Sequence, residues 1–153
     1  RAAGRAEQAK KLLNFVVVGG GPTGVEFCGE LADFMSQDLK SRYPQIAQHF
    51  KITLVEALPG LLTMFHKTIG AYVQEHLEGQ GVEVKLNAMV KQVEPNVVSL
   101  KKKDGGVDQM DYGLLIWVAG VGMRPFTKRL ADMIGKENGQ TDRRGLLVDE
   151  CLR

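Results

Sequence analysis

Cysteine is scarce in this sequence, and the two cysteines that occur, Cys28 and Cys151, stand far apart. Neither belongs to a Cys-x-x-Cys pair or to a grouping with histidine, so we expect no disulfide framework and no zinc site. Apolar runs are short, and none approaches the ~20 residues that a membrane-spanning helix needs. The first four residues also lack the apolar stretch of a secretory signal peptide. These absences favour an intracellular protein with reduced thiols.

The chain also lacks an excess of either charge, because 20 Lys and Arg residues stand against 18 Asp and Glu residues. This balance gives no electrostatic footprint of a nucleic-acid-binding protein, and the basic cluster 101–103 is too short to change that. Histidines are few as well, and none has partners at a metal-ligand spacing, so we expect no metal site. With 153 residues, of which 44% are hydrophobic, the chain accommodates one compact domain with a substantial core. Both ends interrupt a structural pattern, so we expect an excised domain.

What the sequence does contain is an alternation of buried strands and amphipathic helices. Runs of apolar, mostly β-branched residues are typical of strands buried on both faces of a parallel sheet, and they occur at 14–18, 51–55 and 114–118. Helical patterns occupy 6–13, 25–39 and 61–80, the second ending at or before Tyr43 because a proline follows it.

The middle of the chain has a different pattern. Segments 82–86, 90–93 and 97–100 alternate or are short apolar runs, and residues 103–106 have the chemistry of a hairpin turn. We expect these segments to form a small antiparallel meander. The whole pattern predicts an α/β fold, with helices on a parallel sheet and one meander.

Some individual side chains are also expected in the core. Trp117 and Phe65 are large and apolar, and Cys28 lies on the inward stripe of its helix as a small buried hydrophobe. The expected inward stripe of the 61–80 helix is Ile69, Tyr72, Val73, His76 and Leu77.

A glycine-rich turn, residues 19–24, directly follows the first strand and opens a helix. In this context the Gly-x-Gly-x-x-Gly spacing is typical of a dinucleotide-binding turn. Gly19 would allow the tight turn, Gly21 the close approach of a diphosphate, and Gly24 the close packing of the helix. The helix start offers unpaired N–H groups to phosphates, and Pro22 loses nothing there. The alternative is a turn that serves packing alone.

Two acidic residues complete the candidate site. Glu56 ends the second strand, where an acid accepts hydrogen bonds from the adenosine ribose and repels the 2′-phosphate of NADP, which favours NAD. It lies roughly thirty residues past the glycines rather than the usual ~20, an excess that we assign to an insertion at 36–50. Alternatively, Glu56 is a solvated strand-end residue. Glu26 either closes a capping box with Thr23 or faces the nicotinamide end of a bound dinucleotide.

The stretch 15–27, with the letters FVVVGGGPTGVEF, continues into GELADF at 29–34. Together they closely resemble type II NADH:quinone oxidoreductases, also called alternative NADH dehydrogenases. Further segments similar to that family lie at 43–44, 54–57, 112–120 and 145–150, so that the resemblance covers nearly all of 12–153.

The resemblance implies a Rossmann-like FAD/NAD(P)-binding fold in a peripheral flavoprotein of the mitochondrial inner membrane. Such enzymes pass a hydride from NADH to FAD and two electrons to a quinone, without pumping protons. Their NADH domain is inserted in the FAD domain. Residues 1–13 would then be a connecting helix, 14–134 the NADH-binding domain and 135–153 a return segment. The flavin would be bound mainly by the missing FAD domain, membrane contact would come only through missing segments, and a homodimer would be one of the full protein. Alone, the chain could bind NADH but should not turn over.

The resemblance also assigns residues. Glu26 would position the nicotinamide side, and the loop Ala119–Gly120 would skirt the nicotinamide and the flavin. The expected cofactor-binding residues are Gly19, Gly20, Gly21, Pro22, Thr23, Gly24, Glu26, Glu56, Ala57, Ala119 and Gly120.

Two alternatives stay open from the sequence. One is the NADH domain of a pyridine-nucleotide:disulfide or ferredoxin reductase, which shares the glycines and the Ala-Gly loop. The other is a nucleotide-sensing module without chemistry. Flanking sequence would distinguish the reductase by a cysteine pair next to the flavin, and the quinone enzyme by amphipathic helices.

Overall fold

The computed structural model describes residues 2–102 and 104–152, and the chain divides after Ala119 into two compact units. The first unit holds the predicted strands and the glycine turn. The second begins at Gly120. The predicted borders after residues 13 and 134 separate the NADH-binding domain from segments expected to connect to an FAD domain. These borders stay predictions.

A parallel sheet of four strands in the order β3-β2-β1-β7 forms the centre of the first unit. Its strands are β1 (Asn14–Val18), β2 (Lys51–Val55), β3 (Val82–Lys85) and β7 (Leu114–Trp117). The β-branched runs of β1 and β2 pair in register over their full length, from Asn14 opposite Lys51 to Val18 opposite Val55. The predicted strands are therefore confirmed, and they meet side by side with their carboxyl ends at one edge.

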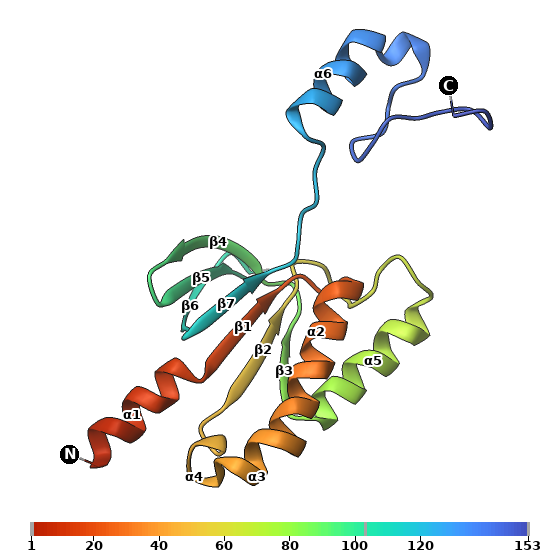
Figure 1. The fold of residues 1–153 in the computed structure, drawn as a ribbon. Helices are drawn as coiled ribbons and strands as arrows, with labels where there is room; N and C mark the ends of the chain where they lie inside the picture. The colour runs from red at the N-terminus through yellow and green to blue at the C-terminus, as the bar shows by residue number, and fades with distance from the viewer. Residues whose placement is uncertain (1, 103, 153) are drawn as a thin grey trace. The chain divides into compact units, whose positions relative to one another are not determined.

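Helices α2 (Pro22–Asp33) and α5 (Lys67–Gly79) pack on one face of this sheet (Figure 1). Leading into β1 is α1 (Ala2–Leu12), as predicted. After α2 the chain stays helical through a π-helical stretch, η1 (Phe34–Leu39), and a short turn, α3 (Lys40–Arg42), before Tyr43 leaves the helical region. A further short helix, α4 (Pro44–Ala47), then leads to β2. The helix end predicted from Pro44 is confirmed, because the residue before a proline disfavours the helical conformation.

An antiparallel meander of β4 (Met89–Glu94), β5 (Val97–Lys101) and β6 (Val107–Asp111) covers the other face of the sheet. The turn predicted near residues 103–106 joins β5 to β6, although Lys103 itself lies outside the described residues. One assignment was wrong. Segment 82–86 is not part of the meander, because β3 pairs with β2 in the parallel sheet.

Alternate side chains of the central strand enter two separate cores. Val17 packs with Cys28 and Leu77 in the helix-side core. Val16 and Val18 pack in the meander-side core with Val98 and Leu100. Because β1 is covered on both faces, its side chains from Val16 onward are buried, which explains its continuous apolar run.

The second unit contains α6 (Pro125–Ile134) and a short 3-10 helix, η2 (Lys136–Asn138). Gly135, at φ 85°, ends α6 in a conformation that favours glycine. Among the residues that the structure describes, no helix is both long and apolar enough to cross a membrane.

Several large apolar side chains are not where sequence reasoning placed them. Trp117 is 54% exposed and Phe65 is 50% exposed, so neither is a core residue. In α5, Leu77 is buried and Val73 is partly buried against it, whereas other members of the predicted stripe are exposed: Ile69, Tyr72 and His76.

Candidate dinucleotide-binding site

The glycine turn connects the carboxyl end of β1 to the start of α2. Gly19 has a φ of 119°, which favours glycine, and its N–H donates to the Val55 carbonyl at 2.9 Å. A Cβ on Gly19 would lie 3.0 Å from the Cβ of Ala119, so the predicted residues Gly19 and Ala119 are neighbours. Gly19 thus allows the turn and also the close approach of the segment that follows β7.

Gly24 and Gly21 differ in what surrounds them. A Cβ on Gly24 would overlap the carbonyl oxygen of Gly19, so only glycine lets α2 pack this closely on the turn. Gly21 has φ −78° and ψ −177°, an extended conformation open to any residue, and a Cβ there would meet nothing within 4 Å. Nothing in the described chain requires glycine at position 21. The open space in front of it is what a ligand would need.

The start of α2 presents unpaired backbone donors. Gly21 is the N-cap, no side chain caps this helix, and Pro22 occupies the first turn. The first intrahelical bond runs from Val25 N–H to the Gly21 carbonyl at 3.0 Å. Amides earlier in the first turn have no partner within a helix, and the helix dipole adds a partial positive charge. The site therefore has the donors and the sign of charge that fit a phosphate.

Glu56 follows β2 at the same edge of the sheet and lies against the glycine turn. Its Oε2 accepts a hydrogen bond from Gly20 N–H at 2.6 Å, and its Oε1 accepts one from Leu58 N–H at 2.8 Å. The residues between Phe34 and Ala47 form η1, α3 and α4, which account for the long spacing between the glycines and Glu56. Glu56 is half-buried and not a freely solvated strand-end residue. Ala57, next to it, is exposed.

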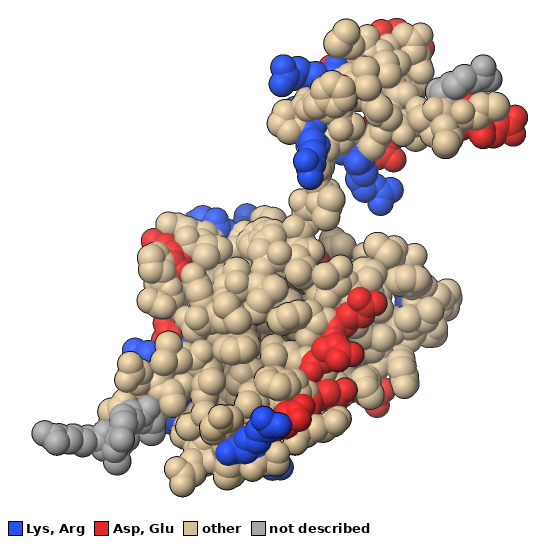
Figure 2. Space-filling view, viewed as in Figure 1, with Lys and Arg blue, Asp and Glu red and all other residues tan. Residues whose placement is uncertain are grey.

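Glu26 does not close a capping box. The N-cap of α2 is Gly21 rather than Thr23, and no side-chain cap is formed. Glu26 is exposed on α2 together with Glu30 and Asp33, and Figure 2 shows acidic side chains in a row over this helix. Its predicted role beside the nicotinamide stays a prediction.

The loop after β7 contributes Ala119, which lies beside Gly19 and whose carbonyl accepts a hydrogen bond from the Trp117 indole N–H at 2.8 Å. Gly120 has a φ of 73° and is the first residue of the second unit.

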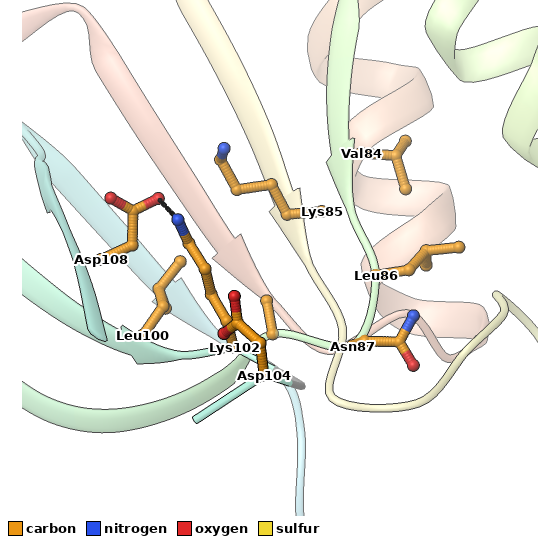
Figure 3. A pocket seen from close by; sticks show the side chains of 9 residues that line it. Val84, Lys85, Leu86, Asn87, Leu100, Lys102, Asp104 and Asp108 are labelled. Carbon is orange, nitrogen blue, oxygen red and sulfur yellow. Dashed lines mark ion pairs between the residues drawn. The ribbon is translucent and has the colours of Figure 1, made fainter. Parts of the chain in front are cut away.

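A cavity of about 440 Å³ lies between the end of β3 and the β5–β6 hairpin (Figure 3). Lys85 and Asn87 line it from one side, and the ion pair of Lys102 with Asp108, at 3.5 Å, lies on the other. None of the site residues predicted from the sequence lines this cavity.

The burial of Cys28 bears on its possible role as a nucleophile. Cys28 is fully buried in the helix-side core, and burial raises the pKa of its thiol from 9.0 to about 12, so it carries no nucleophilic thiolate near neutral pH. Across residues 2–102 and 104–152, no group of three or more His, Cys, Asp or Glu side chains is placed to hold a metal ion.

The geometry agrees with comparisons to known proteins. The model of the pyridine nucleotide-disulphide oxidoreductase family matches residues 1–153. The chain belongs to this family. The match covers both units, including the glycine turn, β2 and Glu56.

The chain is also similar in sequence to curated relatives, of which two are described here. It is 46% identical over 147 residues to the mitochondrial external alternative NAD(P)H-ubiquinone oxidoreductase B2 of Arabidopsis thaliana. It is 40% identical over 145 residues to the mitochondrial external NADH-ubiquinone oxidoreductase 2 of Saccharomyces cerevisiae. These alignments cover 96% and 95% of this chain but only 25% and 26% of the relatives. The chain therefore spans about a quarter of the length of the curated relatives it matches.

Among solved structures, the chain is similar to NDH2 from Plasmodium falciparum in complex with NADH, with a TM-score of 0.80 and 29% identity. This likeness covers 88% of this chain and 28% of that one. A ferredoxin reductase from Rhodopseudomonas palustris, at a TM-score of 0.54 and 19% identity, shows the shared fold alone. The predicted fold class and the resemblance to the alternative NADH dehydrogenases are both confirmed.

Proposed function

We propose that this chain is the NADH-binding domain of a flavin-dependent, non-proton-pumping NADH:quinone oxidoreductase. The observation that carries the proposal is the start of α2, where no side chain caps the helix, the Cβ position of Gly21 is open, and Glu56 accepts a hydrogen bond from Gly20. The names of the relatives, which are NADH- or NAD(P)H-ubiquinone oxidoreductases of mitochondria, support the electron donor and acceptor.

In this proposal the diphosphate of NADH binds to the amides of the first turn of α2. Those amides lose no side-chain cap when they bind it, because none is present. The helix dipole favours the negative charge, and the missing Cβ at Gly21 lets the phosphate oxygens approach the backbone.

The adenosine ribose then reaches Glu56. A carboxylate offers about four lone-pair sites, and the amides of Gly20 and Leu58 use two of them. Two sites are left for the two ribose hydroxyls. The carboxylate is held by both amides, so it cannot turn away from a 2′-phosphate, and we propose that NADH is preferred over NADPH.

The nicotinamide end would extend toward Glu26 and the loop Ala119–Gly120, where the chain contributes position rather than acid–base chemistry. FAD, when bound, would accept the hydride and supply the redox chemistry. We assign its binding mainly to segments outside this sequence, together with quinone reduction and peripheral attachment to the mitochondrial inner membrane. On this proposal residues 14–134 bind NADH, and 1–13 and 135–153 connect to the FAD domain.

Calorimetric titration with NADH and NADPH tests the assignment of Glu56. Replacement Glu56→Ala removes the ribose acceptor, so NADH binding should weaken by about 1–3 kcal/mol. The matched control is Glu75→Ala, which removes an exposed glutamate from α5 and should leave NADH affinity unchanged. Equal or tighter binding of NADPH by the unmodified chain would contradict the proposed role of Glu56.

A further inference from the structure

We propose that the segment 56–62, here called the clamp, sets the geometry of the glycine turn through Gly20, so that Glu56 and Leu62 are positioning residues for the diphosphate. This goes beyond the ribose contact of Glu56, and it rests on the proposed function. The clamp comprises Glu56, which directly follows β2, and the loop from Ala57 to Leu62, whose last residue is hydrogen-bonded to Gly20.

Both backbone groups of Gly20 are bound by the clamp. The Gly20 N–H donates to Glu56 Oε2 at 2.6 Å, a short bond to a charged acceptor. The Gly20 carbonyl accepts from Leu62 N–H at 2.9 Å. Gly20 lies between Gly19, which has the positive φ of the turn, and Gly21, whose Cβ position is open. Fixing both peptide groups of Gly20 therefore fixes the direction in which the backbone at Gly21 points.

The space beside Gly20 is too small for a side chain unless its neighbours shift. A Cβ at this position would lie 2.6 Å from Leu61 Cδ2 and 3.0 Å from Glu56 Oε2. Leu61 is only 3% exposed, so its side chain has little room to move away. A side chain at position 20 would therefore force Leu61 or Glu56 to shift, whereas Gly21 is crowded by nothing in the described chain.

Leu62 adopts a conformation that only the surrounding contacts explain. Its φ is 50°, in the left-handed region that residues other than glycine rarely occupy. Its side chain is buried in the helix-side core, and its N–H is the donor to Gly20. Such conformations cost free energy and persist where neighbouring contacts fix them, often at functional sites. Here they orient a backbone donor at the glycine turn.

The clamp also contacts α5 and the residues that follow β3. A Cβ on Gly70 of α5 would lie 2.5 Å from the Leu61 carbonyl oxygen, so α5 presses directly on the clamp. At the end of β3, Ala88 N–H donates to the Glu56 carbonyl at 3.0 Å and Asn87 N–H donates to the Leu58 carbonyl at 3.1 Å. These contacts restrain the clamp, so its two hydrogen bonds to Gly20 restrain the position of Gly20 as well.

A nucleotide without ribose hydroxyls distinguishes the two roles of Glu56, because it can respond to the geometry of the turn but cannot form the ribose contact. We compare the binding of ADP and of 2′,3′-dideoxy-ADP to the unmodified chain and to Glu56→Ala by calorimetry. If Glu56 also positions the turn, Glu56→Ala should weaken binding of the dideoxy nucleotide by about fivefold. If the unmodified chain and Glu56→Ala bind the dideoxy nucleotide equally, the clamp is overturned.

A second readout needs no ligand. In ¹H–¹⁵N spectra of the unliganded chain, the Gly20 amide should resonate downfield and exchange slowly, and Glu56→Ala should remove both signatures. The isosteric Glu56→Gln keeps one acceptor oxygen, so it should retain one of the two amide bonds and show intermediate affinity for the dideoxy nucleotide. This variant covers the case in which Glu56→Ala does not fold. The control Glu75→Ala should leave the Gly20 amide unchanged.

The two readouts distinguish the clamp from the proposed function. If the unmodified chain binds neither nucleotide and does not bind NADH, the proposed function fails, and the Gly20 resonance still decides the clamp. If that resonance and its exchange rate are the same in Glu56→Ala and Glu56→Gln as in the unmodified chain, the clamp does not exist.

Discussion

The glycines of the turn between β1 and α2 occupy different surroundings, and only some of them are crowded by other atoms of the chain. Gly19 is needed for a φ of 119°, and Gly24 because a Cβ would overlap the Gly19 carbonyl oxygen. Gly20 is needed because Leu61 and Glu56 fill the space beside it. Gly21 alone faces open space. The turn therefore separates into glycines that build the site and one that leaves room for a ligand.

This separation gives a matched pair of variants. Gly24→Ala should destabilise the fold strongly, because its new methyl group would overlap the backbone carbonyl oxygen of Gly19, so that the turn or α2 would have to shift. Gly21→Ala should unfold at the same temperature as the unmodified chain but bind NADH more weakly, because its methyl group occupies the space of the diphosphate. Thermal unfolding and calorimetry measure both effects. Unchanged NADH affinity in Gly21→Ala would contradict the proposed position of the diphosphate.

Residue types and spacing predicted the glycine turn and Glu56, because the motif follows from local backbone chemistry. They could not predict Leu62 or the two amides on Glu56, since these contacts depend on how a loop folds back beneath the turn. Trp117 was wrongly assigned to the core because hydrophobicity does not tell which part of a face is covered. Leu115 packs against the meander-side core, whereas Trp117, on the same strand, is 54% exposed.

At the scale of elements, β3 shows why a correct pattern led to a wrong assignment. The alternation in 82–86 does indicate a strand with one polar face, and it was taken for part of the meander. In the structure that polar face carries Glu83, which forms ion pairs with Lys51 at 2.7 Å and with Lys85 at 2.8 Å. A parallel strand at the edge of the sheet thus alternates because ion pairs, not core residues, line one of its sides.

The ion pairs of β3 predict how stability depends on pH. Burial alone would raise the pKa of Glu83, but hydrogen bonds and charge attraction from Lys51 and Lys85 outweigh burial and lower it from 4.5 to about 2. A lowered pKa in the folded state stabilises the fold above the unfolded value, and this contribution is lost as pH falls from 4.5 toward 2. The effect should be modest because the Glu83 side chain is 37% exposed.

The expected result is that Glu83→Gln unfolds at a lower temperature than the unmodified chain at neutral pH. The difference should shrink as the pH is lowered through this window. Melting curves at several pH values measure it, with Glu75→Gln on α5 as the control. A difference that stays constant down to the acid limit would contradict the ion-pair account.

The helix that follows the glycine turn ends where Pro44 predicts, but its internal geometry was not predicted. The chain remains helical to Arg42, within the predicted insertion at 36–50, through the π-helical stretch Phe34–Leu39. Wider π-helical turns accommodate extra residues within a helix, and hydrophobic periodicity carries no indication of them. The insertion thus lengthens the connection to β2 without moving Glu56 away from the turn.

For the whole molecule, we propose that the chain positions NADH and does not carry out the complete reaction. The first unit brings an amide-lined turn and a carboxylate to one edge of a parallel sheet, the edge where α/β proteins bind ligands. Fold class was predictable from the sequence because strands, helices and turn agree at every level. The chain spans about a quarter of its curated relatives, so the rest of the reaction is assigned to other parts of such a protein.

This assignment predicts that the chain binds NADH but does not oxidise it. With a water-soluble quinone, the near-ultraviolet absorbance of NADH should decrease no faster than in buffer alone, because a hydride acceptor is not held beside the nicotinamide. A full-length relative serves as the positive control. Sustained NADH oxidation by the chain would mean that it carries a complete site of its own.

The most direct test of the central claim is a crystal structure of the chain with NADH. The account predicts that the diphosphate contacts the backbone amides at the start of α2, beside Gly21, and that the adenosine ribose hydroxyls hydrogen-bond to Glu56. A diphosphate bound elsewhere, or a ribose turned away from Glu56, would contradict it.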